Sequence, residues 1–297
     1  LNRESVTFSK RKETCQIYTG TVATEDVTWS SENAQVATFD KGVITAVGMG
    51  ETVVWAEYEG VRVSCSVKCD IDPNDISGLS REPVLTPPKE LTVDSSFFDD
   101  AVFIGDSVTE MLYHHNIAYG DFGKAKFLTA KSYGVGNAIY DKMEMTYRGK
   151  SYRNIEEAVA ATGAKKVFIM LGMNDIARGD YGYIDGCITN WGTLVDLLRS
   201  ACPDITIYIQ SMTPIWTGGE KGGLKNSRMD EYNAKLEVFA AENGCKFIDV
   251  APYMKDETGG LATKFCVDEY VHLTYTGTKA WAQVLRSYTG YDIKEAQ

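Results

Sequence analysis

Residues 101–110 of the chain, AVFIGDSVTE, are the stretch that decides the fold. Four apolar residues in a row, two of them β-branched, are typical of a strand buried on both faces. Glycine, aspartate and serine then interrupt the run, and an amphipathic segment follows. A serine at the carboxyl end of a buried strand, beside a glycine that lets the backbone turn, lies where open α/β sheets keep their functional groups. The alternative is an ordinary strand-to-helix turn in which Asp106 or Ser107 only caps the helix.

The rest of the second half of the chain alternates strands with helices. Four more runs favour strands, at 127–135, 166–172, 206–211 and 246–250. Between them apolar residues recur at helical spacing, as in Trp191, Leu194, Val195 and Leu198. Five strands alternating with helices predict an α/β domain, a flavodoxin-like doubly wound parallel sheet, which we place at 93–297.

The first part of the chain has a different pattern. Short runs rich in β-branched and aromatic residues, separated by glycine turns, predict a small all-β sandwich at 1–70. Residues 71–92 hold four of the seven prolines and few apolar residues, which is the composition of a semi-stiff linker.

The β-rich segment resembles the bacterial Ig-like group 2 domain. The resemblance is carried by VTWSSEN at 27–33, VAT at 36–38, GVITAVG at 42–48 and GETVV at 50–54. It implies a non-catalytic spacer or adhesive module of the kind found on secreted or surface-attached bacterial proteins. Because the sequence begins at Leu1 rather than at methionine, a removed leader is compatible with it, and we expect an extracellular or cell-surface location.

Bulk composition excludes several partners. The net charge of −11 argues against nucleic acid or an anionic membrane, since both require basic patches. No apolar run approaches the length of a membrane span. The seven cysteines lack the spacing of a metal site. Cys15 could form a disulfide with Cys65 or Cys69, or all seven could be free thiols. We expect neither a metal nor a cofactor.

Chemistry-bearing residues follow the ends of the predicted strands. Ser107 follows the first strand, Gly134, Gly136 and Asn137 the second, and Asn174 the third, while an acidic loop before the last helix carries His272. The carboxyl ends of parallel strands meet at one edge of a sheet. A serine, an acid–histidine pair and amide donors are the components of an acyl-transfer site.

Together these residues resemble the SGNH (GDSL-like) hydrolase family from about residue 98 to 285. GDS at 105–107, GMND at 172–175 and His272 match three blocks of the family in the right order, with Val108 where many members have leucine. The resemblance implies that Ser107 is the nucleophile and His272 the general base. It also implies an oxyanion hole made by the Ser107 amide, the Asn174 side chain and a backbone amide. We choose Gly136 for that amide, with Gly134 and Asn137 as alternatives.

The acid of the triad departs from the family pattern. The family usually has aspartate three residues before the histidine, where this chain has Glu269, and Asp268 lies four before. We favour Asp268, on the view that the loop has one extra residue, and keep Glu269 as the alternative acid.

Other polar residues allow competing interpretations. His114 and His115 are expected at the surface. Asn174 could cap a helix, and Trp216 could stack on a sugar ring or serve as a hydrophobic lid. Asp106 and Asp175 could be mistaken for a carboxylate pair of a glycosidase or a metal site; the family resemblance instead makes them structural hydrogen-bonding residues.

These observations lead to two hypotheses about function. The first is a serine carboxylic-ester hydrolase that removes a small acyl group, which we expect to be acetyl, from an acylated small molecule or polysaccharide through an acyl-enzyme. The second is a surface adhesion or binding protein whose hydrolase domain is inactive. The intact serine, asparagine and histidine favour the first.

Overall fold

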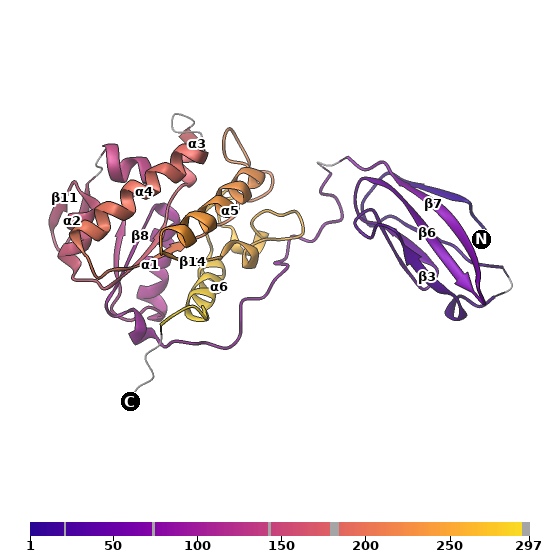
Figure 1. Cartoon of the computed structure of the whole chain (residues 1–297), viewed down its shortest axis with the longest axis horizontal. Coiled ribbons are helices and arrows are strands. Elements are labelled where there is room, and N and C mark those ends of the chain that lie inside the picture. Colours follow the sequence, from indigo (N-terminus) through magenta and orange to yellow (C-terminus); the bar gives the residue numbers. More distant parts are fainter. Residues whose placement is uncertain (21, 73–74, 142–143, 179–183, 293–297) are drawn as a thin grey trace. The chain divides into compact units, whose positions relative to one another are not determined.

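The chain divides into two compact units, Leu1–Ser80 and Arg81–Gln297, in a computed structural model that describes residues 1–20, 22–72, 75–141, 144–178 and 184–292 (Figure 1). The division lies inside the predicted linker at 71–92. The second half of that stretch belongs to the second unit: the Val84 amide donates to the Lys255 carbonyl at 2.9 Å, and the Thr92 amide to the Arg286 carbonyl at 3.1 Å. Residues 81–92 therefore belong to the second unit and are hydrogen-bonded to it at these points.

The first unit is a β-sandwich. One sheet has the order β1-β7-β6-β3 and the other β2-β5-β4. Buried side chains from both sheets form one core, in which residues such as Ile44 and Val54 have no exposed surface. The strands are β1 (Ser5–Phe8), β2 (Thr14–Gln16), β3 (Thr28–Ser31), β4 (Ala37–Asp40), β5 (Val43–Ala46), β6 (Gly50–Tyr58) and β7 (Val61–Cys69).

The second unit is built on a five-stranded parallel sheet, as the sequence predicts. Its strands are β8 (Ala101–Gly105), β9 (Lys126–Thr129), β12 (Lys166–Met170), β13 (Thr206–Gln210) and β14 (Lys246–Ile248). The spatial order is β14-β13-β12-β8-β9, with every neighbouring pair parallel. In domain order this is 5-4-3-1-2, the flavodoxin-like arrangement, and the α/β fold class is confirmed.

Helices flank this sheet (Figure 1). They are α1 (Ser107–Tyr119), α2 (Ile155–Thr162), α3 (Met173–Arg178), α4 (Ile184–Ala201), α5 (Asn226–Glu242) and α6 (Tyr275–Arg286). Helix α1 packs on α6, and α4 packs on α2 and α5. All five residues of β8 are buried, which explains the uninterrupted apolar run that begins at Ala101.

The strand order fixes where a site can form. The chain passes from β8 to the edge strand β9 and then to β12 on the other side of β8, so the order reverses between β8 and β12. Ligands of open α/β sheets bind outside the carboxyl ends of strands at this switch point. Ser107 follows β8, and Asn174 follows β12.

Two local features differ from expectation or add to it. The predicted strand at 127–135 ends at Thr129, since the later apolar residues Tyr133 and Val135 are buried in a loop. A short antiparallel hairpin, β10 (Met145–Tyr147) and β11 (Lys150–Tyr152), was not predicted.

All seven cysteines are free thiols. Within the described ranges, no helix is both long and apolar enough to cross a membrane.

The expected surface position is correct for His114 and wrong for His115. His115 has no exposed surface; its Nε2 lies 2.8 Å from Asp121 Oδ2 and its Nδ1 3.1 Å from Thr278 Oγ1. Arg286 completes the group by pairing with Asp121 at 2.6 Å. The partners come from the turn after α1 and from α6, so this group joins the helix that begins at Ser107 to the helix that follows the His272 loop.

Candidate active site

Ser107 is presented by the turn between β8 and α1. A Cβ on Gly105 would lie 1.9 Å from Thr109 Oγ1, so this approach of strand and helix requires glycine. Asp106 caps the helix, because its Oδ1 accepts from the Val108 amide at 2.9 Å, and the capping interpretation of Asp106 is correct. As the first helical residue, Ser107 has an amide without an intrahelical partner, which leaves it available to an anion at the helix N-terminus.

The loop at 266–274, called the histidine loop below, places Asp268 and His272 in one hydrogen-bonded line with Ser107. His272 Nε2 lies 3.0 Å from Ser107 Oγ, and His272 Nδ1 lies 2.5 Å from Asp268 Oδ2. The imidazole and the carboxylate are each about one third exposed, at 35% and 33%. A serine hydroxyl bonded to an imidazole whose second nitrogen faces a carboxylate is the arrangement that activates serine in hydrolases.

The loop conformation explains why Asp268 rather than Glu269 lies beside the ring. Asp268 Oδ1 accepts from the backbone amides of Tyr270, Val271 and His272 at 3.0–3.1 Å. An aspartate that bonds amides just ahead of it curls the chain into a turn, and this turn brings Oδ2 under the imidazole. Glu269 has a positive φ of 54° and an exposed side chain.

Burial and hydrogen bonding act against each other on the Asp268 carboxylate. Burial by itself would raise the pKa of Asp268. The hydrogen bonds that it accepts from the His272 ring and backbone outweigh burial, so the pKa lies below its usual range. The carboxylate is thus held ionised beside the ring.

Asn174 follows β12, and its side chain reaches residues that follow β8 and β9. Its Nδ2 donates to Asp106 Oδ2 at 2.7 Å and to the Tyr133 carbonyl at 3.2 Å, so the side chain is oriented by partners rather than used as a helix cap. Asp106 is almost fully buried, and burial raises the pKa of Asp106 to about 6, against the opposing hydrogen bonds from the backbone of α1. Asp106 therefore joins the serine turn to the asparagine.

The glycine loop at 134–137 is held by Asp175. The amides of Val135 and Gly136 donate to the two carboxylate oxygens of Asp175, each at 2.8 Å. Burial raises the pKa of Asp175, and these two amides oppose that rise. A Cβ on Gly134 would lie 2.4 Å from Asp175 Oδ2, so only glycine allows the carboxylate this close.

This contact changes the assignment of the oxyanion donors. The Gly136 amide, which we expected as the third donor, points at Asp175. The Gly134 amide donates to Asn137 Oδ1 at 2.9 Å. Both amides thus already have acceptors, Gly136 in α3 and Gly134 within the loop. The direction of a backbone N–H is set by the local conformation of the chain and not by its position after a strand.

The Trp216 loop borders the histidine loop. The Trp216 amide donates to the Tyr270 carbonyl at 2.7 Å, and a Cβ on Gly219 would lie 2.3 Å from the Glu269 carbonyl oxygen. The guanidinium of Arg81 lies 4.9 Å from the centroid of the Trp216 ring. Arg81 therefore covers part of the indole, which restricts the face that could stack on a sugar.

Sequence reasoning missed Arg178. This residue of α3 donates to Asn137 Oδ1 at 2.9 Å and to the Ser132 carbonyl at 2.5 Å, and so ties the glycine loop to the helix that carries Asn174. Its position four residues after Asn174 on a short helix was the only signal that could have found it.

Among the described residues, no group of three or more histidine, cysteine or acidic side chains could hold a metal ion.

Comparison with known proteins agrees with this fold and these motifs. A model of the GDSL-like Lipase/Acylhydrolase family matches residues 103–280. The match spans more than half of the chain, and the chain belongs to this family of hydrolases. A comparison with curated proteins found no match.

The chain also resembles solved structures. A GDSL-like lipase from Bacteroides thetaiotaomicron VPI-5482 is 18% identical with a TM-score of 0.50, over 68% of this chain and 89% of that one. A carbohydrate esterase of family 3 from Talaromyces cellulolyticus is 16% identical with a TM-score of 0.45, over 62% of this chain and 93% of that one. At 18% identity the likeness to the lipase concerns the fold alone.

Proposed function

We propose that the protein is a serine esterase that hydrolyses a small acyl ester, acetyl above all, on a carbohydrate, through an acyl-enzyme. The observation that carries the proposal is the hydrogen-bonded line from Asp268 through His272 to Ser107, with distances of 2.5 and 3.0 Å. Membership of the acylhydrolase family supports the reaction class.

In the first half of the reaction Ser107 Oγ attacks the ester carbonyl. His272 Nε2 takes the serine proton, and Asp268 holds the ring with Nδ1 protonated and stabilises the imidazolium that forms. The tetrahedral intermediate then collapses, the alcohol leaves with the proton from His272, and Ser107 carries the acyl group. Water attacks this acyl-enzyme with the same histidine as base, and the acid is released.

The charge that develops on the carbonyl oxygen needs donors that are in place beforehand. We assign the Ser107 amide and Asn174 Nδ2 to this role. One hydrogen of Asn174 is held by Asp106 at 2.7 Å, and the other makes only the longer contact of 3.2 Å with the Tyr133 carbonyl. We expect the oxyanion to accept from this second hydrogen in place of the Tyr133 carbonyl.

The choice of an acetylated carbohydrate rests on the N-terminal β-sandwich. Its sequence resembles modules of exported bacterial proteins, which suits an extracellular enzyme that works on a polymer. Release of acetate from a panel of acetylated polysaccharides tests this choice.

Hydrolysis of 4-nitrophenyl acetate by the intact chain and by Ser107→Ala tests the reaction itself. A nucleophile that acts with its base as a unit supplies most of the rate, so the variant should lose kcat by about five to six orders of magnitude. Unchanged hydrolysis by Ser107→Ala would falsify the proposed function.

A further inference from the structure

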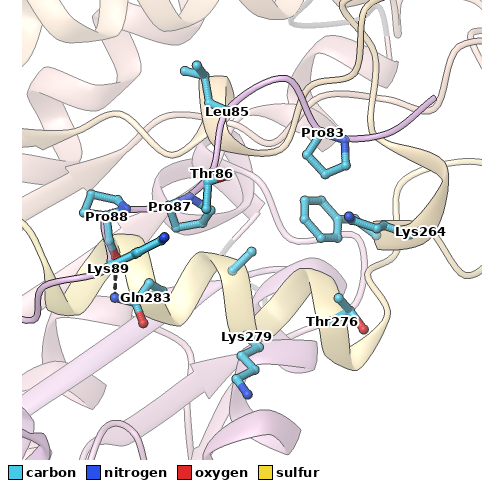
Figure 2. A pocket seen from close by; sticks show the side chains of 12 residues that line it. Pro83, Leu85, Thr86, Pro87, Pro88, Lys89, Lys264, Thr276, Lys279 and Gln283 are labelled. Carbon is cyan, nitrogen blue, oxygen red and sulfur yellow. Dashed lines mark hydrogen bonds between the residues drawn. The ribbon is translucent and has the colours of Figure 1, made fainter. Parts of the chain in front are cut away.

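A cavity of about 470 Å³ opens on the second unit between residues 83–89 and helix α6 (Figure 2). Ser107, Asp268 and His272 do not line it. Apolar groups form much of its wall, among them Pro83, Pro87, Pro88, Phe265 and Ala280. Apolar walls with a few polar groups are characteristic of sites for small molecules.

The cavity is basic in a chain that is acidic overall. Three lysines and no acidic residue line it, whereas the whole chain carries a net charge of −11. Lys264 pairs with Glu82 at 2.6 Å. In the part of the chain that the structure describes, Lys89 and Lys279 are exposed and form no ion pair. Figure 2 shows Lys89 reaching into the gap between its own segment and α6, and Lys279 leaving the helix on the other side.

The outer wall of the cavity is held in place. Three of the seven residues at 83–89 are prolines, which fix φ. Gln283 of α6 donates to the Pro88 carbonyl (Figure 2), and Ser287 Oγ donates to the Glu90 carbonyl at 2.6 Å. The site is thus preorganised, which lowers the entropy lost when a ligand binds.

The cavity adjoins the base of the histidine loop. The Thr274 amide donates to the Phe265 carbonyl, and Thr274 Oγ1 to the Lys264 carbonyl, each at 2.8 Å. These contacts close the loop that carries Asp268 and His272. Thr276, another lining residue, is four positions from His272, so its Cα lies within roughly 14 Å of the Cα of the histidine.

We propose that this cavity is a subsite for a carboxylate-bearing polysaccharide whose acyl ester is placed at Ser107. Lys89, which reaches into the cavity and has no ion-pair partner among the described residues, attracts the carboxylates, and Lys279 on the other side of α6 adds a longer-range attraction. The flat apolar faces of the proline rings suit the C–H faces of pyranose rings. Lysine ammonium groups on flexible stems act as point charges, which accommodates a repeating polymer better than one fixed carboxylate. The inference rests on the proposed function and names the substrate class of the same site.

The experiment measures binding separately from catalysis. Ser107→Ala of the full chain is titrated calorimetrically with a de-esterified oligogalacturonate, with cellohexaose as a neutral sugar and with polyphosphate as a polyanion without sugar. We expect the oligogalacturonate to bind most tightly, and to bind more weakly as salt is raised, since exposed charges are screened. Hydrolysis of 4-nitrophenyl acetate by the unchanged chain reports on the proposed function independently.

Two double variants in the Ser107→Ala background locate the site. Lys89→Glu with Lys279→Glu should weaken oligogalacturonate binding about tenfold, because two attractions become repulsions. Lys165→Glu with Lys225→Glu makes the same change in net charge at exposed lysines outside the cavity, and should change affinity less than about twofold. An equal loss in both variants, equal binding of polyphosphate, or no binding of the oligogalacturonate would each overturn the proposal.

Discussion

Two loops at the carboxyl ends of the strands are each organised by one aspartate that accepts hydrogen bonds from backbone amides. The two carboxylates differ in exposure, in their remaining partners and in the direction of their pKa shift. Asp175 is 2% exposed and uses both oxygens on the amides of the glycine loop. Asp268 is about one third exposed; its Oδ1 holds the histidine loop, and its Oδ2 is left for the imidazole. Burial raises the pKa of Asp175, whereas hydrogen bonding lowers that of Asp268.

The difference shows that an aspartate bonded to backbone amides can fix a loop, and can in addition orient a catalytic base. A carboxylate whose oxygens are both taken by backbone amides can only fix a loop. A carboxylate with a free oxygen beside a histidine can also orient a base. We therefore expect substitutions at the two aspartates to separate catalysis from folding.

The largest effect is expected at Asp268. Asp268→Asn removes the negative charge beside the ring and favours the wrong imidazole tautomer, so kcat for 4-nitrophenyl acetate should fall by about three to four orders of magnitude. Glu269→Gln is the matched control at the neighbouring acid and should change kcat by little. If the two variants exchange their effects, Glu269 orients the base and the extra-residue interpretation of the loop is wrong.

Asn174→Ala should have the next largest effect. Loss of one oxyanion donor costs about two to three orders of magnitude in kcat, with KM little changed, because the bond strengthens mainly in the transition state. Steady-state kinetics separates the two parameters. A variant that loses affinity and keeps kcat would show that Asn174 binds the ground state instead.

Asp175→Asn should act mainly on stability. The substitution places an NH₂ group against one of two buried backbone N–H groups, so the free energy of unfolding should fall by about 1–3 kcal/mol. Urea denaturation of this variant and of Asp268→Asn provides the comparison. A larger loss of stability in the Asp268 variant would contradict the assignment of roles.

The smallest effect is a difference in pH dependence. A lowered pKa, as at Asp268, adds stability that is present above the unfolded value of 3.8 and is lost as the pH falls through the folded value. A raised pKa, as at Asp175, adds a contribution that declines as the pH rises from 3.8 through the folded value. The unfolding free energy of the unchanged chain relative to Asp268→Asn should rise with pH, and relative to Asp175→Asn it should fall. Slopes of equal sign would contradict this.

The fold was predictable because burial leaves a pattern in the sequence. The run that begins at Ala101 is apolar since both faces of β8 are buried. The same reasoning from apolar residues made the predicted second strand too long, because Tyr133 and Val135 are buried in a loop and not in a strand. The polarity of His115 predicted exposure, and its partner Asp121 lies too far along the chain to be recognised as one.

For the site, the motifs correctly placed the side chains at the carboxyl ends of the strands. They could not give the direction of the Gly136 amide, which depends on Asp175, 39 residues away. Nor could spacing choose between Asp268 and Glu269, because the choice follows from amide contacts within the loop.

The central claim is that Ser107 is an activated nucleophile, and covalent labelling tests it most directly. The intact chain is treated with a fluorophosphonate probe, and the adduct is located by mass spectrometry. Only a serine with a positioned base reacts readily, so one adduct per chain, on Ser107, is predicted. An unlabelled Ser107 in the folded chain would contradict the claim, and would favour a binding protein with an inactive hydrolase domain.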